Sequence, residues 1–354
     1  MTQSEFIKYL SAFDLTTKRI ENLIELMEGD FSFEKLKSLK LGQIVGDELA
    51  KNLKNCAFQD FLDDYLEKLE KKHIILLTIC DSEFPDKLTK IEDAPMYIFC
   101  KGDISLLNKK AIAIVGTRSP SNYGRVVTER FAGELAKEGV VIVSGLAYGV
   151  DGISHRKALD VGGKTIAVLG SGFDHVYPAV NTNLAEEIAE KGLLISEYRP
   201  GVSATRYTFP RRNRIVAGLS DGVLITEAGK KSGTLITKDF AIENGIIVYA
   251  VPGNITSEKS YGTNEIIATL QGTCALSSED ILKDLGIDKS KRKKSLQLSI
   301  EEEKIVEILS NGERDIEFLS ENVDFDIKKL NSLLTTLEIK SIIKRLPGGF
   351  YSLG

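Results

Sequence analysis

Six short apolar runs rich in β-branched residues recur between Ala111 and Gly253, and they constrain the fold more than any other feature of the chain. They occupy residues 111–116, 140–145, 165–170, 193–198, 222–228 and 246–253. The runs show no polar–apolar alternation, so both faces of each strand are expected to be buried, as in a parallel sheet covered by helices. Amphipathic stretches separate them. The pattern predicts a doubly wound α/β domain whose functional loops follow the carboxyl ends of the strands.

The chain has 354 residues, which is enough for two or three domains. Residues 1–72 have apolar positions three and four apart, which predicts helices, and their glycine-punctuated turn resembles those of small helical hairpin domains. We expect a helical domain similar to the SAM or helix-hairpin-helix type. Residues 73–288 form the α/β core and begin with a strand, a loop and a second strand. Residues 289–298 form a basic linker. Residues 299–354 predict a winged helix, three helices followed by a glycine-turned hairpin.

Composition narrows the class of protein. Apolar residues make up 42% of the chain, but no apolar segment approaches the roughly 18 residues that span a bilayer. The N-terminus does not have the pattern of a secretory leader. We therefore expect a cytoplasmic protein. The four cysteines form no CxxC pair, so neither a zinc site nor a disulfide framework is expected.

An arginine-rich window at residues 198–220 stands out because the whole chain carries a net charge of −5. The window holds five arginines and no acidic residue: Arg199, Arg206, Arg211, Arg212 and Arg214. Arginines next to Phe209 suit a polyanion with exposed bases, since guanidinium groups hold phosphates and an aromatic ring stacks on a base. A basic helix start on a solvated surface is the alternative that this window alone leaves open.

Small polar loops follow three of the predicted strands. They are Gly116-Thr117-Arg118, Ser144-Gly145 and Ser232-Gly233-Thr234. Glycines allow backbone amides to approach a ligand, and helix N-termini favour anions. Together with the arginines, the three loops predict an anion-binding strip along one sheet edge. Lys164, in the turn before the third run, is either an ordinary turn lysine or a further contact of this strip.

Two familiar nucleotide-binding motifs are matched only in part. Residues 168–175 begin like a dinucleotide fingerprint but lack the third glycine and close the third strand run instead of the first. Gly163-Lys164-Thr165 resembles the end of a P-loop, but it precedes a strand where a P-loop follows one. We therefore expect neither a bound dinucleotide nor ATP hydrolysis, and no other cofactor or metal is indicated.

A catalytic constellation is also missing. His155 has no nucleophile partner in the sequence pattern and is expected to cap or pack a helix. Glu197 and Glu227 end two strand runs and could form a carboxylate pair, but ion pairs with the nearby arginines are the favoured interpretation.

Taken together, the motifs resemble the DNA-processing protein A family (DprA, also called Smf). The matching blocks are residues 115–124, 144–159, 162–178, 195–201, 209–220, 226–245 and 251–267. The resemblance implies an extended Rossmann-like core that binds and protects single-stranded DNA during natural transformation. It also implies displacement of single-strand-binding protein, loading of the RecA recombinase and no bond chemistry.

The resemblance assigns residues as well. The family's Gly-Ser/Thr-Arg motif falls on residues 116–118, and its Phe-Pro-x-Arg-Asn motif on Phe209 to Asn213. We expect Arg118 and the arginines of residues 206–214 to hold successive phosphates, with Phe209 stacked on a base. Family members act as dimers, which places a homodimer surface between residues 262 and 276. Its expected contacts are Asn264, Ile267, Leu270 and Leu276.

One rival activity is the hydrolysis of nucleoside monophosphates by related Rossmann-like enzymes. Those enzymes carry a PGGxGTxxE loop whose glutamate acts on the ribose. The corresponding stretch here, EAGKKSGTLIT, has no glutamate after Gly233-Thr234 before Glu243. A scaffold that binds only proteins is a third possibility, which leaves the arginine-rich window unexplained.

Overall fold

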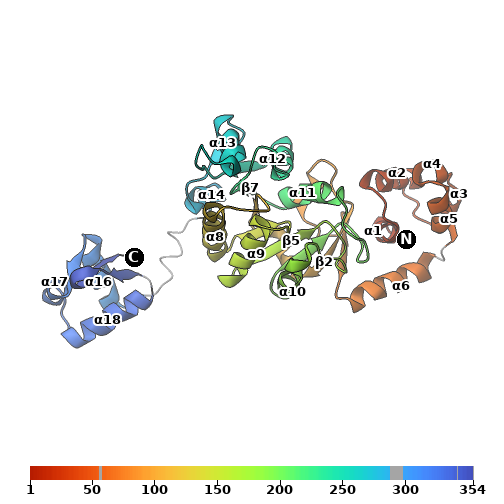
Figure 1. Ribbon diagram of the computed structural model, residues 1–354. Helices are drawn as coiled ribbons and strands as arrows, with labels where there is room; N and C mark the ends of the chain where they lie inside the picture. The colour runs from red at the N-terminus through yellow and green to blue at the C-terminus, as the bar shows by residue number, and fades with distance from the viewer. Residues whose placement is uncertain (56–57, 288–297, 341, 354) are drawn as a thin grey trace. The chain divides into compact units, whose positions relative to one another are not determined.

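The computed structural model describes residues 1–55, 58–287, 298–340 and 342–353. The chain divides into two compact units, Met1–Ile287 and Asp288–Gly354 (Figure 1). Residues 289–297 of the predicted basic linker lie outside the described residues.

A nine-stranded sheet organises the first unit. Its strands are β1 (Ile75–Thr78), β2 (Tyr97–Gly102), β3 (Ala111–Val115), β4 (Val141–Ser144), β5 (Thr165–Leu169), β6 (Leu193–Ser196), β7 (Gly222–Ile225), β8 (Ile247–Ala250) and β9 (Thr273–Cys274). Their order is β1-β2-β6-β5-β4-β3-β7-β8-β9. All six apolar runs form strands, and these pair in parallel. The predicted mostly parallel α/β fold is therefore confirmed, with β1 and β2 as an antiparallel addition.

Helices cover both faces of this sheet (Figure 1). The helical segments from β1 to the end of the unit are α7 (Asp86–Thr89), η2 (Ile104–Asn108), α8 (Asn122–Lys137), α9 (Val150–Asp160), η3 (Ala179–Asn181), α10 (Thr182–Lys191), α11 (Thr208–Gly218), α12 (Thr234–Glu243), η4 (Glu258–Ser260), α13 (Tyr261–Ala268) and α14 (Ser278–Asp284). Ile112 and Ile114 of β3 pack with α8 and α9, whereas Ala113 and Val115 pack with α11. This alternation explains the unbroken apolar runs, because successive strand side chains point to opposite, equally buried faces.

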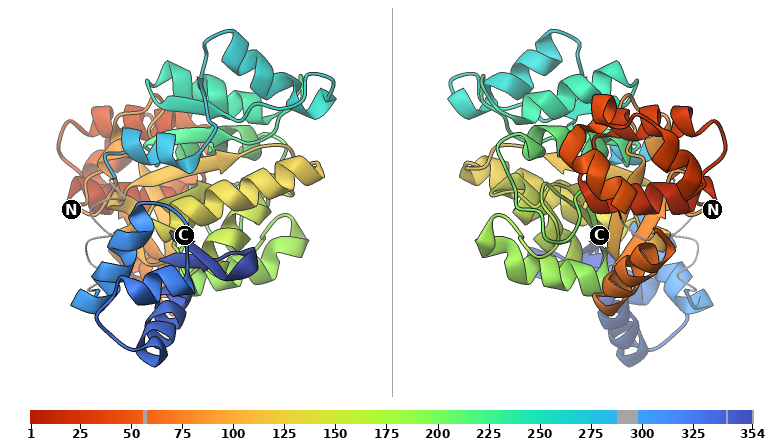
Figure 2. Two further views of the ribbon diagram at one scale, coloured as in Figure 1. Left: turned by 90° about the vertical axis from the view of Figure 1, so that its left-hand side faces the viewer. Right: turned by 90° about the vertical axis from the view of Figure 1, so that its right-hand side faces the viewer.

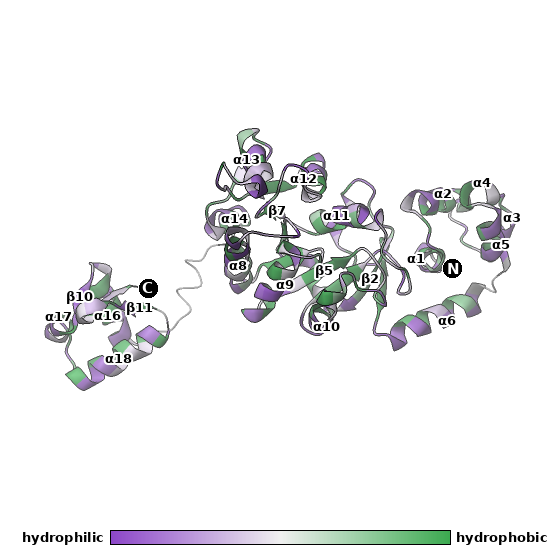
Figure 3. Cartoon of the chain, in the orientation of Figure 1, coloured by the Kyte–Doolittle hydropathy of each residue, from purple (hydrophilic) through white to green (hydrophobic). Residues whose placement is uncertain are grey.

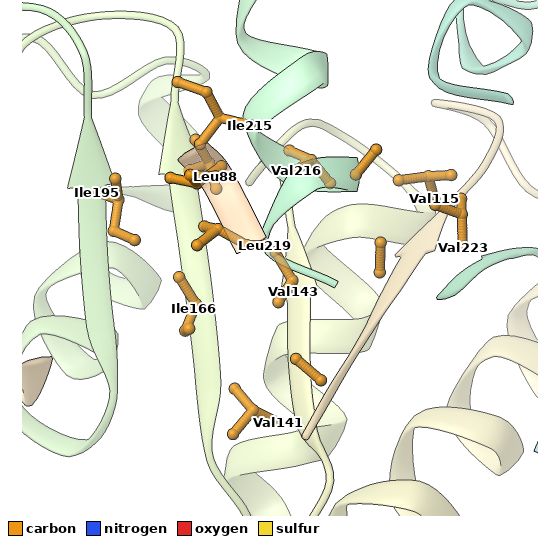
Figure 4. Packing of buried hydrophobic residues seen from close by; sticks show 14 of the residues in the cluster. Leu88, Val115, Val141, Val143, Ile166, Ile195, Ile215, Val216, Leu219 and Val223 are labelled. Carbon is orange, nitrogen blue, oxygen red and sulfur yellow. The ribbon is translucent and has the colours of Figure 1, made fainter. Parts of the chain in front are cut away.

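The C-terminal half of α11 packs on the sheet through apolar side chains. Figure 4 shows Ile215 and Val216 of this helix, and Leu219 at its C-cap, against the valines and isoleucines of the strands. All three side chains are at most 1% exposed. Figure 3 shows the same division by hydropathy, with hydrophobic strands inside helices of mixed character. The apolar half of α11 therefore fixes the position of its N-terminal turns, which carry Arg211, Arg212 and Arg214 of the arginine-rich window.

The N-terminal helices pack at the β1–β2 end of the sheet (Figure 2). They are α1 (Gln3–Leu10), η1 (Ser11–Phe13), α2 (Thr17–Met27), α3 (Phe33–Ser38), α4 (Gly42–Val45), α5 (Asp47–Asn55) and α6 (Phe58–Lys71). Their apolar cluster includes Tyr97 and Phe99 of β2, so helices and sheet share one core. The helical region is as expected, while its assignment to the SAM or helix-hairpin-helix type stays a prediction.

The second unit contains α16 (Ile300–Ser310), β10 (Arg314–Asp315), α17 (Ile316–Glu321), α18 (Ile327–Ile339), β11 (Ile343–Arg345), η5 (Pro347–Gly349) and β12 (Phe350–Leu353). Its three strands form an antiparallel sheet in the order β10-β12-β11. The winged-helix assignment stays a prediction. Within the described parts of both units, every helix is too short or too polar to traverse a bilayer.

Candidate nucleic-acid interface

The main candidate site is a cavity of about 650 Å³ at the carboxyl edge of the sheet. β3 and β7 are neighbours in the sheet, but the chain continues from β3 to β4 on one side and from β7 to β8 on the other. The loops that follow these two strands therefore diverge. Such a divergence opens a crevice that α/β proteins use for ligands. Nine of the predicted residues line the cavity: Gly116, Arg118, Arg206, Phe209, Arg212, Asn213, Ser232, Gly233 and Thr234.

Hydrogen bonds tie the two diverging loops together. The Thr117 amide donates to the carbonyl of Glu227 (2.8 Å), and the Thr234 hydroxyl donates to the carbonyl of Gly116 (2.9 Å). Gly116 has no room for a side chain, because a Cβ there would lie 2.6 Å from Cγ2 of Val150. This edge of the cavity is therefore closely packed.

Two exposed arginines supply the accessible positive charge of the cavity. The Arg118 guanidinium lies over the Phe209 ring, with Cζ 5.8 Å from the ring centroid. The Arg206 guanidinium lies over the Tyr207 ring at 4.7 Å and donates to the Tyr207 hydroxyl. Neither arginine has a carboxylate partner among the described residues. Both groups are thus held by aromatic rings and retain donors for an anion.

Arg212 plays a different part from the one the sequence predicts. It is only 4% exposed, and its Nη1 donates to the carbonyls of Gly145 and Val168 at the ends of β4 and β5. Burial lowers the pKa of its guanidinium to about 10. Because its Nη1 and Nε donors are used inside the protein, Arg212 serves first as a positively charged wall of the cavity, and a phosphate contact through it stays a prediction.

Arg211 and Arg214 also differ from the prediction, since both turn away from the cavity toward acidic residues. Glu197 accepts from Arg214 at 2.5 Å and lies 3.4 Å from Arg211, and Asp93 lies 3.0 Å from Arg214. Arg214 and Glu197 are nearly buried, with side-chain exposures of 5% and 9%. Their role as phosphate ligands is therefore corrected to that of an ion-pair network.

Glu197 and Glu227 have different partners in the structure. The ion pairing expected for Glu197 is confirmed. The same interpretation is wrong for Glu227, which accepts from the amide and hydroxyl of Ser121 at 2.8 and 2.5 Å. Ser121 caps α8, so Glu227 stabilises the start of that helix, where a negative charge is favourable.

Several other predicted contacts either lie outside the cavity or have donors that are already used within the protein. Lys164 precedes β5 at the amino edge of the parallel strands and donates to the carbonyl of Lys191 (2.7 Å), so it does not join the strip. Ser144 is fully buried and donates to the carbonyl of Ile114. The Gly145 and Ser232 amides already donate to Asp151 Oδ2 and to a backbone carbonyl, so their expected role as phosphate donors is corrected.

The cavity lining includes one buried carboxyl group, that of Asp151. Asp151 accepts from the amides of Gly145 (3.1 Å) and Ala147 (3.3 Å), and burial raises the pKa of its carboxyl. His155 is fully buried beside Thr165, with Nδ1 2.6 Å from the hydroxyl oxygen. Burial, assisted by the charge of Arg212, lowers the pKa of His155 to about 3. The expected packing role of this histidine agrees with its position.

Sequence reasoning missed one exposed aromatic residue of the cavity, Tyr177. It follows the loop after β5, and its ring centroid lies 5.5 Å from that of Phe209. The available signal was its place between a glycine-rich post-strand loop and Pro178, the same pattern that singled out the other loops.

The predicted dimer surface combines anchored and exposed residues. The Asn264 side chain exchanges hydrogen bonds with the backbone of Gly253 (3.0 and 3.1 Å), and Ile267 packs against the core. Leu270 and Leu276 are 91% and 70% exposed. Dimerisation through these residues stays a prediction.

The chain is similar to known proteins in sequence and in fold. A family model described as DNA recombination-mediator protein A matches residues 75–286. The chain is 39% identical to DNA processing protein DprA of Bacillus subtilis over 242 residues, covering 66% of this chain and 81% of the relative. It is 34% identical to protein Smf of Synechocystis over 318 residues, covering 86% and 79%.

Two solved structures are similar. DprA of Streptococcus pneumoniae superposes with a TM-score of 0.65 at 35% identity, covering 80% of this chain and 98% of that one. DNA processing protein A of Helicobacter pylori, studied for its single-stranded DNA binding mode, gives a TM-score of 0.55 at 34% identity over 60% and 95% of the chains. The chain therefore belongs to the DNA recombination-mediator protein A family, whose relatives carry the names DprA and Smf.

Proposed function

We propose that this protein binds single-stranded DNA without sequence preference, protects it and loads the RecA recombinase onto it, without catalysing bond chemistry. The main observation in support of this proposal is a pair of exposed arginines, Arg118 and Arg206. Aromatic rings hold both of them at a cavity on the carboxyl edge of the sheet. Guanidinium groups beside aromatic rings bind phosphates and unpaired bases together. The single-stranded DNA binding of the Helicobacter pylori relative supports the proposal.

The distribution of charge in the protein is consistent with a DNA strand that binds at a local basic site, although the whole chain is acidic. The net charge of −5 repels a polyanion at long range, so affinity must come from contacts within the cavity. The wall formed by Arg212 adds a buried positive charge that solvent screens weakly. We expect binding that weakens with salt by roughly 0.7 log unit of affinity per phosphate contact and log unit of salt.

The cellular part of the proposal rests on family membership. It comprises action in the cytoplasm during natural transformation or recombination, displacement of single-strand-binding protein, transfer of the strand to RecA, and a homodimer that joins two cavities. Two linked sites would raise the effective concentration of a strand that reaches both. A winged helix in the second unit would serve contacts with DNA or protein.

The rival nucleoside monophosphate hydrolase finds no support in the cavity. Among the described residues that line it, Asp151 is the single carboxylate, and its Oδ2 accepts hydrogen bonds from two amides of the β4–α9 loop. A carboxylate that acts on a ribose must be within hydrogen-bond reach of the sugar. Release of free base from AMP by the purified protein would revive this alternative.

The test is fluorescence anisotropy of the full chain with labelled oligo-dT and with a duplex of equal length across a salt series. We expect a preference for the single strand. Arg118→Ala should weaken oligo-dT binding and reduce the salt slope by roughly 0.7, since one phosphate contact is lost. Arg130→Ala is the matched control, because Arg130 is an exposed arginine of α8 paired with Glu134. Equal binding by the Arg118→Ala variant and the parent would refute the site.

A further inference from the structure

The aromatic residues around the cavity differ in how much ring surface they leave open. Phe209, expected from the sequence to stack on a base, is enclosed on several sides. The Arg118 guanidinium lies over its ring, and the Tyr177 ring contacts it at an interplanar angle of 47°. The backbone of Gly170 is so close that a Cβ there would lie 2.9 Å from Cδ1 of Phe209. Little of this ring remains for a base.

Tyr177 leaves far more of its ring open. Its side chain lines the cavity, and the residue is 51% exposed while one side rests against Phe209. Tyr207 is more exposed, at 69%, but the Arg206 guanidinium covers its ring and the residue does not line the cavity. Tyr177 is therefore the cavity aromatic with an open face.

The loop that carries Tyr177 is fastened by hydrogen bonds at several points. The Ser171 hydroxyl donates to the carbonyl of His175 (2.7 Å), and the Gly172 amide donates to that of Val202 (2.8 Å). Beyond the tyrosine, the Asn181 side chain donates to the carbonyl of Leu146 (2.9 Å). A stacking residue on a fixed loop loses little conformational entropy when a ligand binds.

From this geometry we propose that Tyr177 is a base-binding subsite: an unpaired nucleobase stacks on its open ring face. Phe209 supports the tyrosine from behind and holds Arg118 beside it, where the phosphate of the same nucleotide passes. The inference rests on the proposed function and deepens it, because it explains selection of single strands. Bases in a duplex are paired and stacked, so their faces cannot reach the ring without unstacking.

The experiment compares two ligands of equal length, oligo-dT and an oligonucleotide of abasic spacers that retains the phosphates. We expect Tyr177→Ala to lose roughly 5- to 150-fold in affinity for oligo-dT, which corresponds to one stacked base. The same variant should bind the abasic strand like the parent and keep its salt slope. Tyr177→Phe should bind oligo-dT normally, because the ring alone is needed.

A second measurement uses the absence of tryptophan from the chain. In the Tyr177→Trp variant the fluorescence of the single indole should be quenched by oligo-dT but not by the abasic strand. Val126→Trp, at a 62% exposed position of α8, should show no quenching with either ligand.

The outcomes separate the two proposals. Failure of the parent to bind oligo-dT overturns the proposed function and this inference with it. Normal parent binding, combined with normal oligo-dT binding by Tyr177→Ala, overturns the inference alone. So does an equal loss of affinity for both ligands, which would make Tyr177 a support for phosphate contacts.

Discussion

The guanidinium group of Arg212 packs directly on the backbone of Gly145. A Cβ at position 145 would lie 2.4 Å from Cζ and from both terminal nitrogens of Arg212. The same guanidinium donates to the carbonyl of Gly145 and to that of Val168. One buried arginine thus joins the carboxyl ends of β4 and β5 at the cavity wall, and a side chain at position 145 would have to displace its guanidinium group.

Gly145→Ala should therefore displace Arg212 and disturb the cavity wall. The added methyl group in a packed site should destabilise the protein by about 1–3 kcal/mol, measured as a lower midpoint of urea unfolding. Oligo-dT affinity should fall as well. Gly201→Ala is the matched control, because no atom lies within 4 Å of a Cβ built there. Unchanged stability of the Gly145→Ala variant would contradict the role given to Arg212.

The Glu197–Arg214 pair yields a prediction about stability that is separate from DNA binding. Glu197→Gln removes the buried anionic partner of Arg214 and leaves it only the half-exposed Asp93. Loss of one member of a fully buried pair costs about 3–5 kcal/mol, and because Asp93 remains we expect a loss toward the lower end of this range. Asp14→Asn breaks the Arg199–Asp14 bridge, whose side chains are 45% and 46% exposed, and should cost at most about 1 kcal/mol. Urea unfolding of both variants compares the two ion pairs. Equal losses would show that burial does not increase the contribution of the Glu197–Arg214 pair to the free energy of unfolding.

The sequence predicts the sheet well because both faces of each strand are buried, so local composition carries the signal. It predicts the arginines less well because their partners are distant: Glu197 and Asp93 for Arg214, Gly145 and Val168 for Arg212. Helical spacing gives part of the answer, since Arg211 and Arg214 lie three residues apart and share one face of α11. The openness of the Tyr177 ring depends on Phe209 and Arg118, which only the tertiary structure brings beside it.

The buried His155 side chain should make the stability of the protein depend on pH. Its pKa is about 3 in the folded protein, because burial disfavours the charged ring, against about 6.5 when exposed. Between these values the unfolded chain binds a proton that the folded protein does not, so stability falls as pH drops below about 6.5. At pH 5, one and a half pH units at about 1.36 kcal/mol each make this loss about 2 kcal/mol.

The measurement is the free energy of urea unfolding at pH 7.5 and pH 5.0 for the parent and for His155→Asn. The asparagine amide can donate to the Thr165 hydroxyl, since that hydroxyl itself donates to the carbonyl of Ile142 (2.6 Å). Contributions from other titrating groups cancel in the difference between the two proteins. We expect the variant to lose less stability on acidification, and an equal loss would show that His155 does not titrate in this range.

Leu270 has a backbone conformation that is unfavourable for leucine and an apolar side chain that is exposed to solvent. Both features are expected of a residue that packs against a second copy of the chain. It follows the C-cap of α13 with φ +57°, where helices usually place glycine or asparagine, and its side chain is 91% exposed. The Gln271 amide donates to the carbonyl of Ile266 and the Leu270 amide to that of Ile267, which forms a Schellman motif. A leucine in this conformation costs about 1–2 kcal/mol in backbone strain, which packing against a second copy of the chain would offset.

Leu270→Asn should relieve part of that strain and remove an apolar contact of the predicted homodimer. At protein concentrations low enough for the monomer, we expect the variant to unfold at a slightly higher urea concentration than the parent. At high concentration, sedimentation equilibrium should show a dimer for the parent and a monomer for the variant. Val126→Asn changes a 62% exposed apolar residue of α8 and should leave the dimer intact. A Leu270→Asn variant that dimerises like the parent would place the interface elsewhere, because removal of a central apolar side chain should weaken it measurably.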